Sequence, residues 1–400
     1  MKHITRNIWI LSLVSLFTDM ASEMLYPVMP VYLKSIGFSI VLIGVLEGLA
    51  ETTAGLSKGF FGQWSDRMGR RRPFVQVGYA LSALSKPMMA VLIYPVWIFL
   101  ARTLDRLGKG VRTGARDALL SDETEAGSKG RVFGFHRAMD TIGAVLGPCL
   151  ALLYLHWYPE DYKTLFLLAF FPGLLAIVCT LLIKEKKVAR PALQKGRPGF
   201  LDFIKYWKTS PPTYRRLAGG LLFFALFNSS DLFLLLQAKA AGMSDTEVIG
   251  VYIFYNLIYA LSAYPLGILA DKIGMKRVFV LGLLLFAGVY GGMAFVRSTW
   301  VIYSLFLFYG LYAAATEGIA KAWISNISEK THTGTAIGTY TAFQSICAFL
   351  ASSLAGLVWY AAGAPPIFLL SALAAMGTVV YLLVVGRGRY TDPTENAQHA

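Results

Sequence analysis

Long apolar runs separated by short polar connections dominate the pattern of hydrophobic and polar positions along the chain. Runs such as 165–183 and 278–296 approach the roughly 20 apolar residues that a helix needs to cross the hydrocarbon core of a bilayer. The runs and the Gly, Pro and charged residues between them predict membrane-spanning helices at about 7–35, 40–63, 73–94, 96–120, 130–157, 163–183, 216–240, 245–269, 277–297, 300–326, 333–360 and 365–386. The sequence therefore indicates an all-α membrane protein with twelve transmembrane helices.

Composition and charge agree with a membrane protein. Of the 400 residues, 56% are hydrophobic and 15% are charged, whereas soluble domains average about 45–50% and about 25%. The net charge of +14 would suit nucleic-acid binding, but the excess Lys and Arg lies in a few connections beside the apolar runs. Basic and non-basic connections alternate, which is the positive-inside pattern. This pattern argues against a nucleic-acid partner and predicts that both termini are cytoplasmic.

The residues that usually carry metal or redox chemistry show no matching pattern. Cys149, Cys179 and Cys347 lie in separate apolar runs, without a C-x-x-C pair. The five histidines lack the spacing of a metal site. A nucleophile with an accompanying base is also missing, so we expect no metal, no cofactor and no enzymatic activity.

The chain divides near its middle into two related halves. The connection at 184–216 is the longest and carries ten Lys and Arg residues. It predicts an N-terminal six-helix bundle at 1–183, a cytoplasmic linker at 184–215, a C-terminal six-helix bundle at 216–387 and a cytoplasmic tail at 388–400. The stretch Gly62-x-x-x-Asp66-Arg67-x-Gly69-Arg70-Arg71 recurs about 205 residues later as Gly267-x-x-x-Asp271-Lys272-x-Gly274-x-Lys276-Arg277. Internal repeats of this kind are typical of transporter folds.

This repeated stretch resembles motif A of the major facilitator superfamily (MFS), and the resemblance covers the whole chain in span count, loop pattern and repeat. It implies two six-helix bundles around a central cavity that work by alternating access. In that family the aspartate of the motif contacts neighbouring helix ends and helps to latch the outward-facing state. By position the latch residues are Gly62, Asp66, Arg67, Gly69, Arg70, Gly267, Asp271, Gly274 and Arg277.

The predicted span at 96–120 carries five cations and two aspartates. A charge that faces lipid at the centre of a span costs about 2.5–3.5 kcal/mol, so this span must face protein or water. Helical spacing places Arg102, Arg106, Lys109 and Arg116 on one face. Arg106-x-x-Lys109-Gly110 resembles motif B of the proton-coupled members, although those members more often have glutamine at the position of Lys109. The resemblance gives Arg106 a part in proton coupling; the alternative is that some of these charges only pair between helices.

The next span contains Gly143-x-x-x-Gly147-Pro148, which resembles motif C of exporters and antiporters. Small residues allow helices to approach closely and proline permits a bend. We therefore assign Gly143, Gly147 and Pro148 to helix packing. Arg137 and Asp140 of the same span could pair with each other or with the span at 96–120.

Carboxylates balance the cations. Asp19 and Glu23 are four residues apart, as are Glu47 and Glu51, so each pair shares a helix face. The resemblance places the N-half charges near one aqueous cavity. Neighbouring carboxylates favour proton uptake and a nearby arginine opposes it. We therefore expect Asp19 or Glu23 to bind the coupling proton, with Arg106 as modulator, and the substrate cavity to include Glu47, Glu51, Arg102, Asp140, Asp231, Tyr255, Asn256, Glu317 and Gln344.

The expected function is secondary active transport, as proton-coupled export of a small amphipathic organic molecule. The cationic face of the span at 96–120 favours the alternative of an importer or facilitator of an organic anion. A channel would have no reason to carry two copies of motif A. The resemblance extends to a group of bacterial and archaeal permeases, which implies a monomer in the cytoplasmic (inner) membrane. Its partners would then be the lipid bilayer, a small-molecule substrate and protons.

Overall fold

The computed structural model describes residues 3–26, 28–92, 94–125, 127–185, 198–296 and 298–385, and the regular elements of these residues are all helices. The chain forms two compact units. Unit 1 comprises Met1–Glu123, Met139–Thr209 and Glu329–Ala342, and unit 2 comprises Thr124–Ala138, Ser210–Ser328 and Phe343–Ala400. The predicted tail at 388–400 and much of the predicted linker lie outside the described residues. The predicted division into bundle, linker, bundle and tail stays a prediction.

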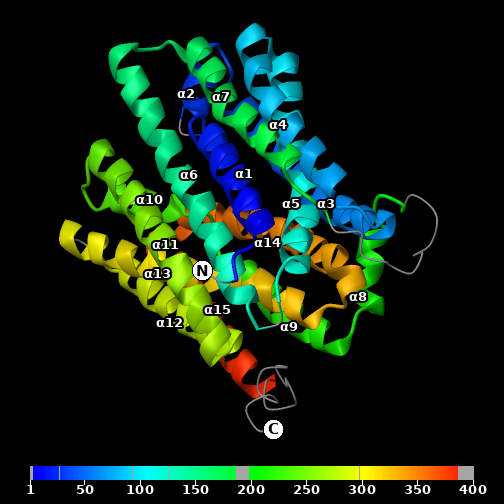
Figure 1. Ribbon diagram of the computed structural model, residues 1–400. Coiled ribbons are helices and arrows are strands. Elements are labelled where there is room, and N and C mark those ends of the chain that lie inside the picture. The colour runs from blue at the N-terminus through cyan, green and yellow to red at the C-terminus, as the bar shows by residue number, and fades with distance from the viewer. Residues whose placement is uncertain are drawn as a thin grey trace. The chain divides into compact units, whose positions relative to one another are not determined.

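The helices of unit 1 come mainly from the first half of the chain. They are α1 (Arg6–Glu23), α2 (Met29–Ser35), α3 (Ile40–Met68), α4 (Arg72–Val91), α5 (Pro95–Asp122), α6 (Lys129–Trp157) from Met139 onward, α7 (Tyr162–Leu181), η1 (Asp202–Lys205) and α8 (Tyr206–Thr209). Helix α5 packs against both α3 and α4, and α7 packs against α1 and α4 (Figure 1). The charged helix α5 is therefore covered by protein on two sides.

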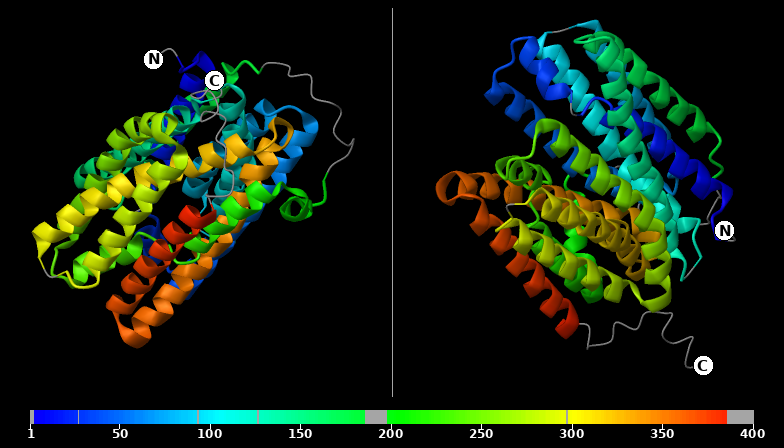
Figure 2. Two further views of the ribbon diagram at one scale, coloured as in Figure 1. Left: turned by 90° about the horizontal axis from the view of Figure 1, so that it is seen from below. Right: turned by 90° about the vertical axis from the view of Figure 1, so that its left-hand side faces the viewer.

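Unit 2 is built mainly from the second half. Its helices are α9 (Pro212–Ala225), α10 (Leu232–Ala240), α11 (Asp245–Ile273), α12 (Met275–Met293), α13 (Thr299–Ile327), α14 (Thr333–Ala362) from Phe343 onward and α15 (Ala364–Val385). Helix α13 packs against α11 and α12, and α12 also packs against α15 (Figure 2). The short helix η2 (Lys330–His332) and the first turns of α14 belong to unit 1.

Seven described helices are long and apolar enough to cross a membrane, namely α6, α7, α11, α12, α13, α14 and α15. The predicted spans at 40–63, 73–94 and 96–120 correspond to α3, α4 and α5. The remaining two predicted spans differ from the structure, because each is a pair of shorter helices. The span at 7–35 consists of α1 and α2, and the span at 216–240 consists of α9 and α10.

Local sequence explains both interruptions. Pro30 occupies the first turn of α2, where its missing N–H costs no hydrogen bond, whereas it would interrupt a helix that continued through it. Between α9 and α10 the chain reads Asn228-Ser-Ser-Asp231, and such side chains compete with the helix for backbone hydrogen bonds. The two interruptions occupy corresponding places in the two halves.

The repeated motif also ends its helix in the same way in both halves. Gly69 terminates α3 with φ 63° and Gly274 terminates α11 with φ 96°. Glycine adopts positive φ without the steric cost that a Cβ atom would bring. These glycines turn the chain after Asp66 and Asp271, and the next helix begins at Arg72 in the first half and at Met275 in the second.

Candidate functional site

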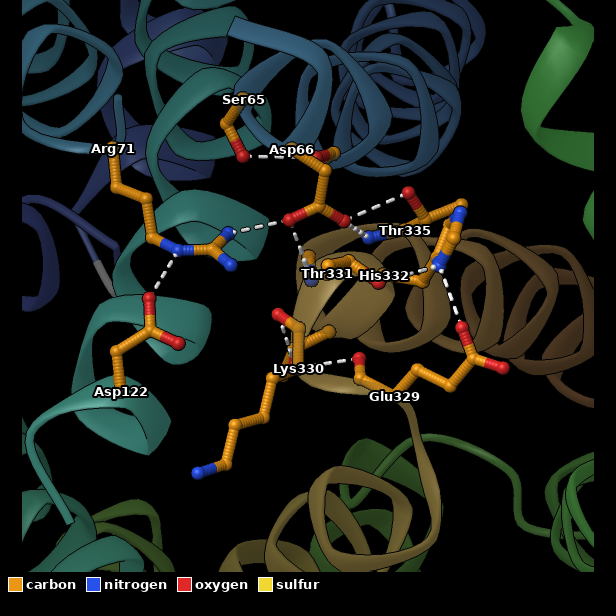
Figure 3. Close-up of polar contacts among 12 residues, drawn as sticks. Ser65, Asp66, Arg71, Asp122, Glu329, Lys330, Thr331, His332 and Thr335 are labelled. Atoms are coloured by element: carbon orange, nitrogen blue, oxygen red, sulfur yellow. Dashed lines mark hydrogen bonds and ion pairs between the residues drawn. The ribbon is translucent and has the colours of Figure 1, made fainter. Parts of the chain in front are cut away.

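Asp66 lies near the end of α3 and its side chain is buried. Its carboxylate accepts hydrogen bonds from the backbone N–H groups of Thr335 (2.6 Å) and Gly334 (3.3 Å) and from the Thr335 hydroxyl (2.8 Å) (Figure 3). The first N–H groups of a helix have no acceptor within it, and a negative charge there also interacts favourably with the helix dipole. Asp66 therefore caps the N-terminus of α14.

Arg71 holds this carboxylate from the other side. Its guanidinium is fully buried and lies 2.7 Å from Asp66 Oδ1 and 2.6 Å from Asp122 Oδ2 (Figure 3). The backbone N–H of Arg71 donates to Glu185 at 2.6 Å. The loop between α3 and α4 is thus attached to α5 and to the chain that follows α7.

Asp271 makes the corresponding contacts in unit 2. Its carboxylate is 1% exposed and accepts from the backbone N–H groups of Gly130 (2.7 Å) and Arg131 (2.9 Å) in the first turn of α6. The side chain of Arg131 also donates to it at 3.0 Å. The cation here comes from the capped helix, whereas in unit 1 it comes from the loop after the aspartate.

Glycine permits each of these approaches. A Cβ atom on Gly62 would collide with the carbonyl oxygen of Gly334, and one on Gly267 would collide with that of Gly130. Of the other predicted latch residues, Arg67 lies 3.9 Å from Asp202, and the remaining two, Arg70 and Arg277, are exposed. The role of these contacts as a latch stays a prediction.

A polar cavity of about 540 Å³ adjoins the Asp66 cap in unit 1. It is lined by Gln63, Asp66, Arg67, Asp202, Lys205, Tyr206, Thr209, His332 and Thr335. The hydrogen bonds that Lys205 and the backbone N–H of Gly199 donate to Asp202 lower the pKa of that carboxyl. Phe203 of the same short helix is buried against Phe60 and Ala342.

Most cations of α5 are neutralised inside unit 1. Lys86 of α4 lies 2.6 Å from Asp105 of α5. Arg102 lies 3.9 Å from Asp105, which is on its own helix. All three side chains are buried. The Lys86–Asp105 pair links α4 to α5, and the part of Arg102 in a substrate cavity stays a prediction.

The second part of α5 shows the same pattern. Arg112 donates to the Ser82 hydroxyl at 2.5 Å and lies 4.6 Å above the ring centre of Tyr79. Arg116 pairs with Asp117 at 2.8 Å. Because these cations have partners on α4 and α5, fewer cations of α5 are free of contacts in the folded protein than its sequence alone suggests.

A different set of charges gathers where α5 meets α1 and α6. Ser15 donates to Asp140, and the carboxyl groups of Asp19 and Asp140 come within hydrogen-bond range of each other. Lys109 of α5 lies close enough to Asp19, Glu23 and Glu51 to attract all three carboxylates, and Arg106 attracts Glu23 and Glu51 as well.

Arg106 itself lies 3.7 Å from Glu51, whose side chain is 48% exposed. The side chain of Glu47 lies outside the described part of the structure. The structure thus brings Asp19, Glu23, Glu51 and Asp140 together around Lys109 and Arg106. The sequence placed Lys109 on the cationic face of α5 and showed that it replaces a glutamine usual in motif B, but it gave Lys109 no role beside these carboxylates.

The predicted packing residues lie between α6 and α1. A Cβ atom on Gly143 would collide with the carbonyl oxygen of Leu16, and one on Gly147 would lie 2.6 Å from that of Met20. Pro148 follows inside α6. This close approach carries Asp140 of α6 to Ser15 and Asp19 of α1.

Unit 2 contains two further groups of polar side chains. Arg137 pairs with Glu317, a partner that sequence spacing did not suggest, and donates to the Tyr259 hydroxyl at 2.5 Å. The carboxylate of Asp231 accepts from the hydroxyls of Tyr255 (2.7 Å) and Tyr309 (2.5 Å).

Asn256 and Gln344 are the other two residues of unit 2 that were predicted to line the cavity. The amide of Asn256 donates to the carbonyl of Tyr252 on its own helix at 3.0 Å, and Gln344 is half-buried on α14. In the described part of the chain, His, Cys, Asp and Glu side chains form no group of three or more that could hold a metal ion.

Broken helices, buried ion pairs and a duplicated carboxylate cap define a multi-pass helical membrane carrier. The sequence model of the Major Facilitator Superfamily matches residues 11–254 and 232–399, and the chain belongs to this family. The predicted family and the predicted MFS fold are thereby confirmed. The protein is a membrane transporter and not an enzyme.

Individual relatives agree with this assignment. The chain is 31% identical over 364 residues to the uncharacterized MFS-type transporter MJ1317 of Methanocaldococcus jannaschii, covering 90% of this chain and 89% of that protein. It is 23% identical to the quinolone resistance protein NorA of Staphylococcus aureus, covering 89% and 91%. The crystal structure of the human organic anion transporter MFSD10 (TETRAN) matches with a TM-score of 0.75 at 16% identity, covering 94% and 99%. The last comparison shows the fold alone.

Proposed function

We propose that this transporter exports a small amphipathic organic molecule in exchange for protons, by alternating access. The observation that carries the proposal is the pair of carboxyl groups of Asp19 and Asp140 beside Lys109 in unit 1. Two carboxyl groups at hydrogen-bond range cannot both stay ionised in a site of low dielectric, so they share one proton. Such a pair is a proton-binding site inside the membrane-spanning part of the protein.

Lys109 favours release of the proton from the carboxyl pair, and exchange requires release as well as binding. When the shared proton leaves, the pair gains a negative charge, and the attraction of the lysine ammonium compensates for part of the cost. Glu23 lies in the range of the same lysine and of Arg106. Asp19 and Glu23 remain the candidates for the proton-binding group, with Lys109 now added to Arg106 as a modulating cation.

The two carboxylate caps suit a transporter that changes conformation. Each cap depends on glycine contacts that a small separation of the helices would break. We infer that the Asp66 and Asp271 caps form in one state of the cycle and open in another. Their position in basic connections between spans supports a cytoplasmic location for both caps and for both termini. The proposed transporter acts as a monomer in the cytoplasmic membrane.

Export is favoured over import by two observations. The relative NorA is described as a quinolone resistance protein, and the Gly143–Pro148 stretch resembles the exporter motif. The alternative of an organic-anion importer or facilitator depends on the cations of α5. Arg102, Arg106 and Arg116 of α5 are, however, paired with carboxylates within unit 1, which leaves fewer cations for an anionic substrate.

Proteoliposomes with an imposed pH gradient test the proposal. A panel of drugs, siderophores and organic anions is offered, and substrate flux and internal pH are followed together. Proton movement opposite to the substrate, lost in Asp19→Asn and Asp140→Asn but retained in Asp202→Asn, supports antiport through the carboxyl pair. Substrate flux that is indifferent to the pH gradient would refute it.

A further inference from the structure

The interruption between α9 and α10 places a carboxylate in an unusual setting. Asp231 stands directly before α10, where aspartate commonly accepts a hydrogen bond from the first turn of the helix that it precedes. Its side chain makes no such bond. The carboxylate instead accepts from the hydroxyls of Tyr255 on α11 and Tyr309 on α13. Asp231 is therefore used for something other than capping its helix.

Aromatic side chains surround the two tyrosines. The ring centres of Tyr255 and Tyr309 are 5.4 Å apart, and those of Tyr309 and Tyr312 are 5.3 Å apart. These three rings are 3–5% exposed, and Tyr290 behind them is fully buried. Tyr252, whose ring centre lies 5.4 Å from that of Tyr255, is half-buried. Asp231 is likewise half-buried, so the residue is not closed off by the tyrosines that its carboxylate contacts.

In the described part of the chain, the carboxylate of Asp231 has no oppositely charged partner. Among the residues that the structure describes, no lysine or arginine forms an ion pair with it. Two neutral hydroxyl donors satisfy only part of the hydrogen-bonding capacity of a carboxylate, which offers about four acceptor positions. A carboxylate with a partly apolar environment and no cation is costly to maintain. In unit 1, by contrast, the buried carboxylate of Asp105 is paired with a cation, Lys86.

We infer that Asp231 binds the cationic group of the transported molecule, and that the substrate is an amphipathic organic cation such as an amine or a quaternary ammonium compound with an apolar body. The cation supplies the missing charge, and the adjacent aromatic rings favour it further through cation–π attraction. Tyr255 and Tyr309 hold the carboxylate in place, and Tyr252 lies at the edge where an apolar body can make contact. This inference rests on the proposed transport function and names the substrate class.

Binding of a pair of probes tests the inference without transport. Tetraphenylphosphonium and tetraphenylborate have nearly the same size and shape but opposite charge. Equilibrium binding of each to the purified full-length protein in detergent is measured for the wild type, Asp231→Asn, Asp231→Glu and Tyr309→Phe. Size-exclusion profiles and thermal unfolding establish that each variant is folded.

We expect saturable binding of tetraphenylphosphonium to the wild type and at least tenfold weaker binding of tetraphenylborate. Asp231→Asn should weaken tetraphenylphosphonium binding about 10- to 100-fold, because one charge partner is lost. Asp231→Glu should retain most of the affinity, and Tyr309→Phe should lower it several-fold. Equal affinity for the two probes, or an unchanged affinity in folded Asp231→Asn, would overturn the inference, as would the absence of saturable tetraphenylphosphonium binding.

The proposed function and this inference fail in different ways. Proton-driven flux of a substrate, together with tetraphenylphosphonium binding that ignores Asp231, leaves the proposed function standing and removes the inference. Asp231-dependent binding in a protein whose substrate flux ignores the pH gradient retains the inference and removes proton coupling.

Discussion

The hydrogen bonds of Asp66 allow us to predict how much its substitution destabilises the N-terminus of α14. Asp66→Asn keeps the shape of the side chain but removes its charge, which weakens the bonds from Gly334 and Thr335 and leaves the fully buried Arg71 with Asp122 alone. Breaking a buried ion pair by removing one partner costs about 3–5 kcal/mol. Each 1.4 kcal/mol corresponds to a factor of about ten, so opening of the first turn of α14 should become roughly 10²- to 10⁴-fold more frequent.

Amide hydrogen exchange measures this opening directly, since exchange of a protected amide follows the free energy of local opening. The amide of Thr335, which donates to Asp66 at 2.6 Å, should exchange faster in Asp66→Asn by that factor. The matched control is Asp271→Asn, which should instead accelerate exchange at Gly130 and Arg131.

The decisive result is which helix each of the two substitutions affects. Each substitution should affect the helix that its own aspartate caps and leave the other helix unchanged. Unaltered exchange of the Thr335 amide in Asp66→Asn would refute the cap. Equal acceleration at both helices in both variants would show general unfolding and would refute the assignment of each carboxylate to one helix end.

Two other predictions concern stability, measured by thermal unfolding in detergent. Lys86→Met leaves the buried Asp105 without its partner at 2.6 Å and should destabilise the protein by about 3–5 kcal/mol; adding Asp105→Leu should restore most of the loss, and an additive effect of the two would contradict the pairing. Gly143→Leu should prevent the close approach of α6 to Leu16 and abolish folding, whereas Gly377→Leu, where an added Cβ meets no atom within 4 Å, should be tolerated.

The sequence predicted the architecture well because its signals are regular. Long apolar runs, alternating basic connections and a motif repeated after about 205 residues are properties of whole segments, and the family assignment confirmed the fold that they predicted. The interruptions of the first and seventh spans were missed, since apolar residues continue on both sides of Met24–Val28 and of the turn before Asp231. Hydropathy averages over such turns, whereas proline and short polar side chains act on single hydrogen bonds.

The pairing of charges was harder to predict. Helical spacing placed the cations of α5 on one face, but spacing cannot tell whether that face meets water or a neighbouring helix. Asp105 pairs with Lys86, which is 19 positions away on α4, and Arg137 pairs with Glu317 of α13. Such partners are fixed by helix packing, so they emerge only with the folded structure.

The central claim is that the Asp19–Asp140 pair carries the exchanged proton, and comparing two modes of transport in proteoliposomes tests it most directly. One mode is accumulation driven by a pH gradient, and the other is exchange of labelled for unlabelled substrate at equal pH, which requires no net proton movement. We predict that Asp19→Asn loses gradient-driven accumulation and retains exchange. Gradient-driven accumulation at the wild-type level in this variant would contradict the account.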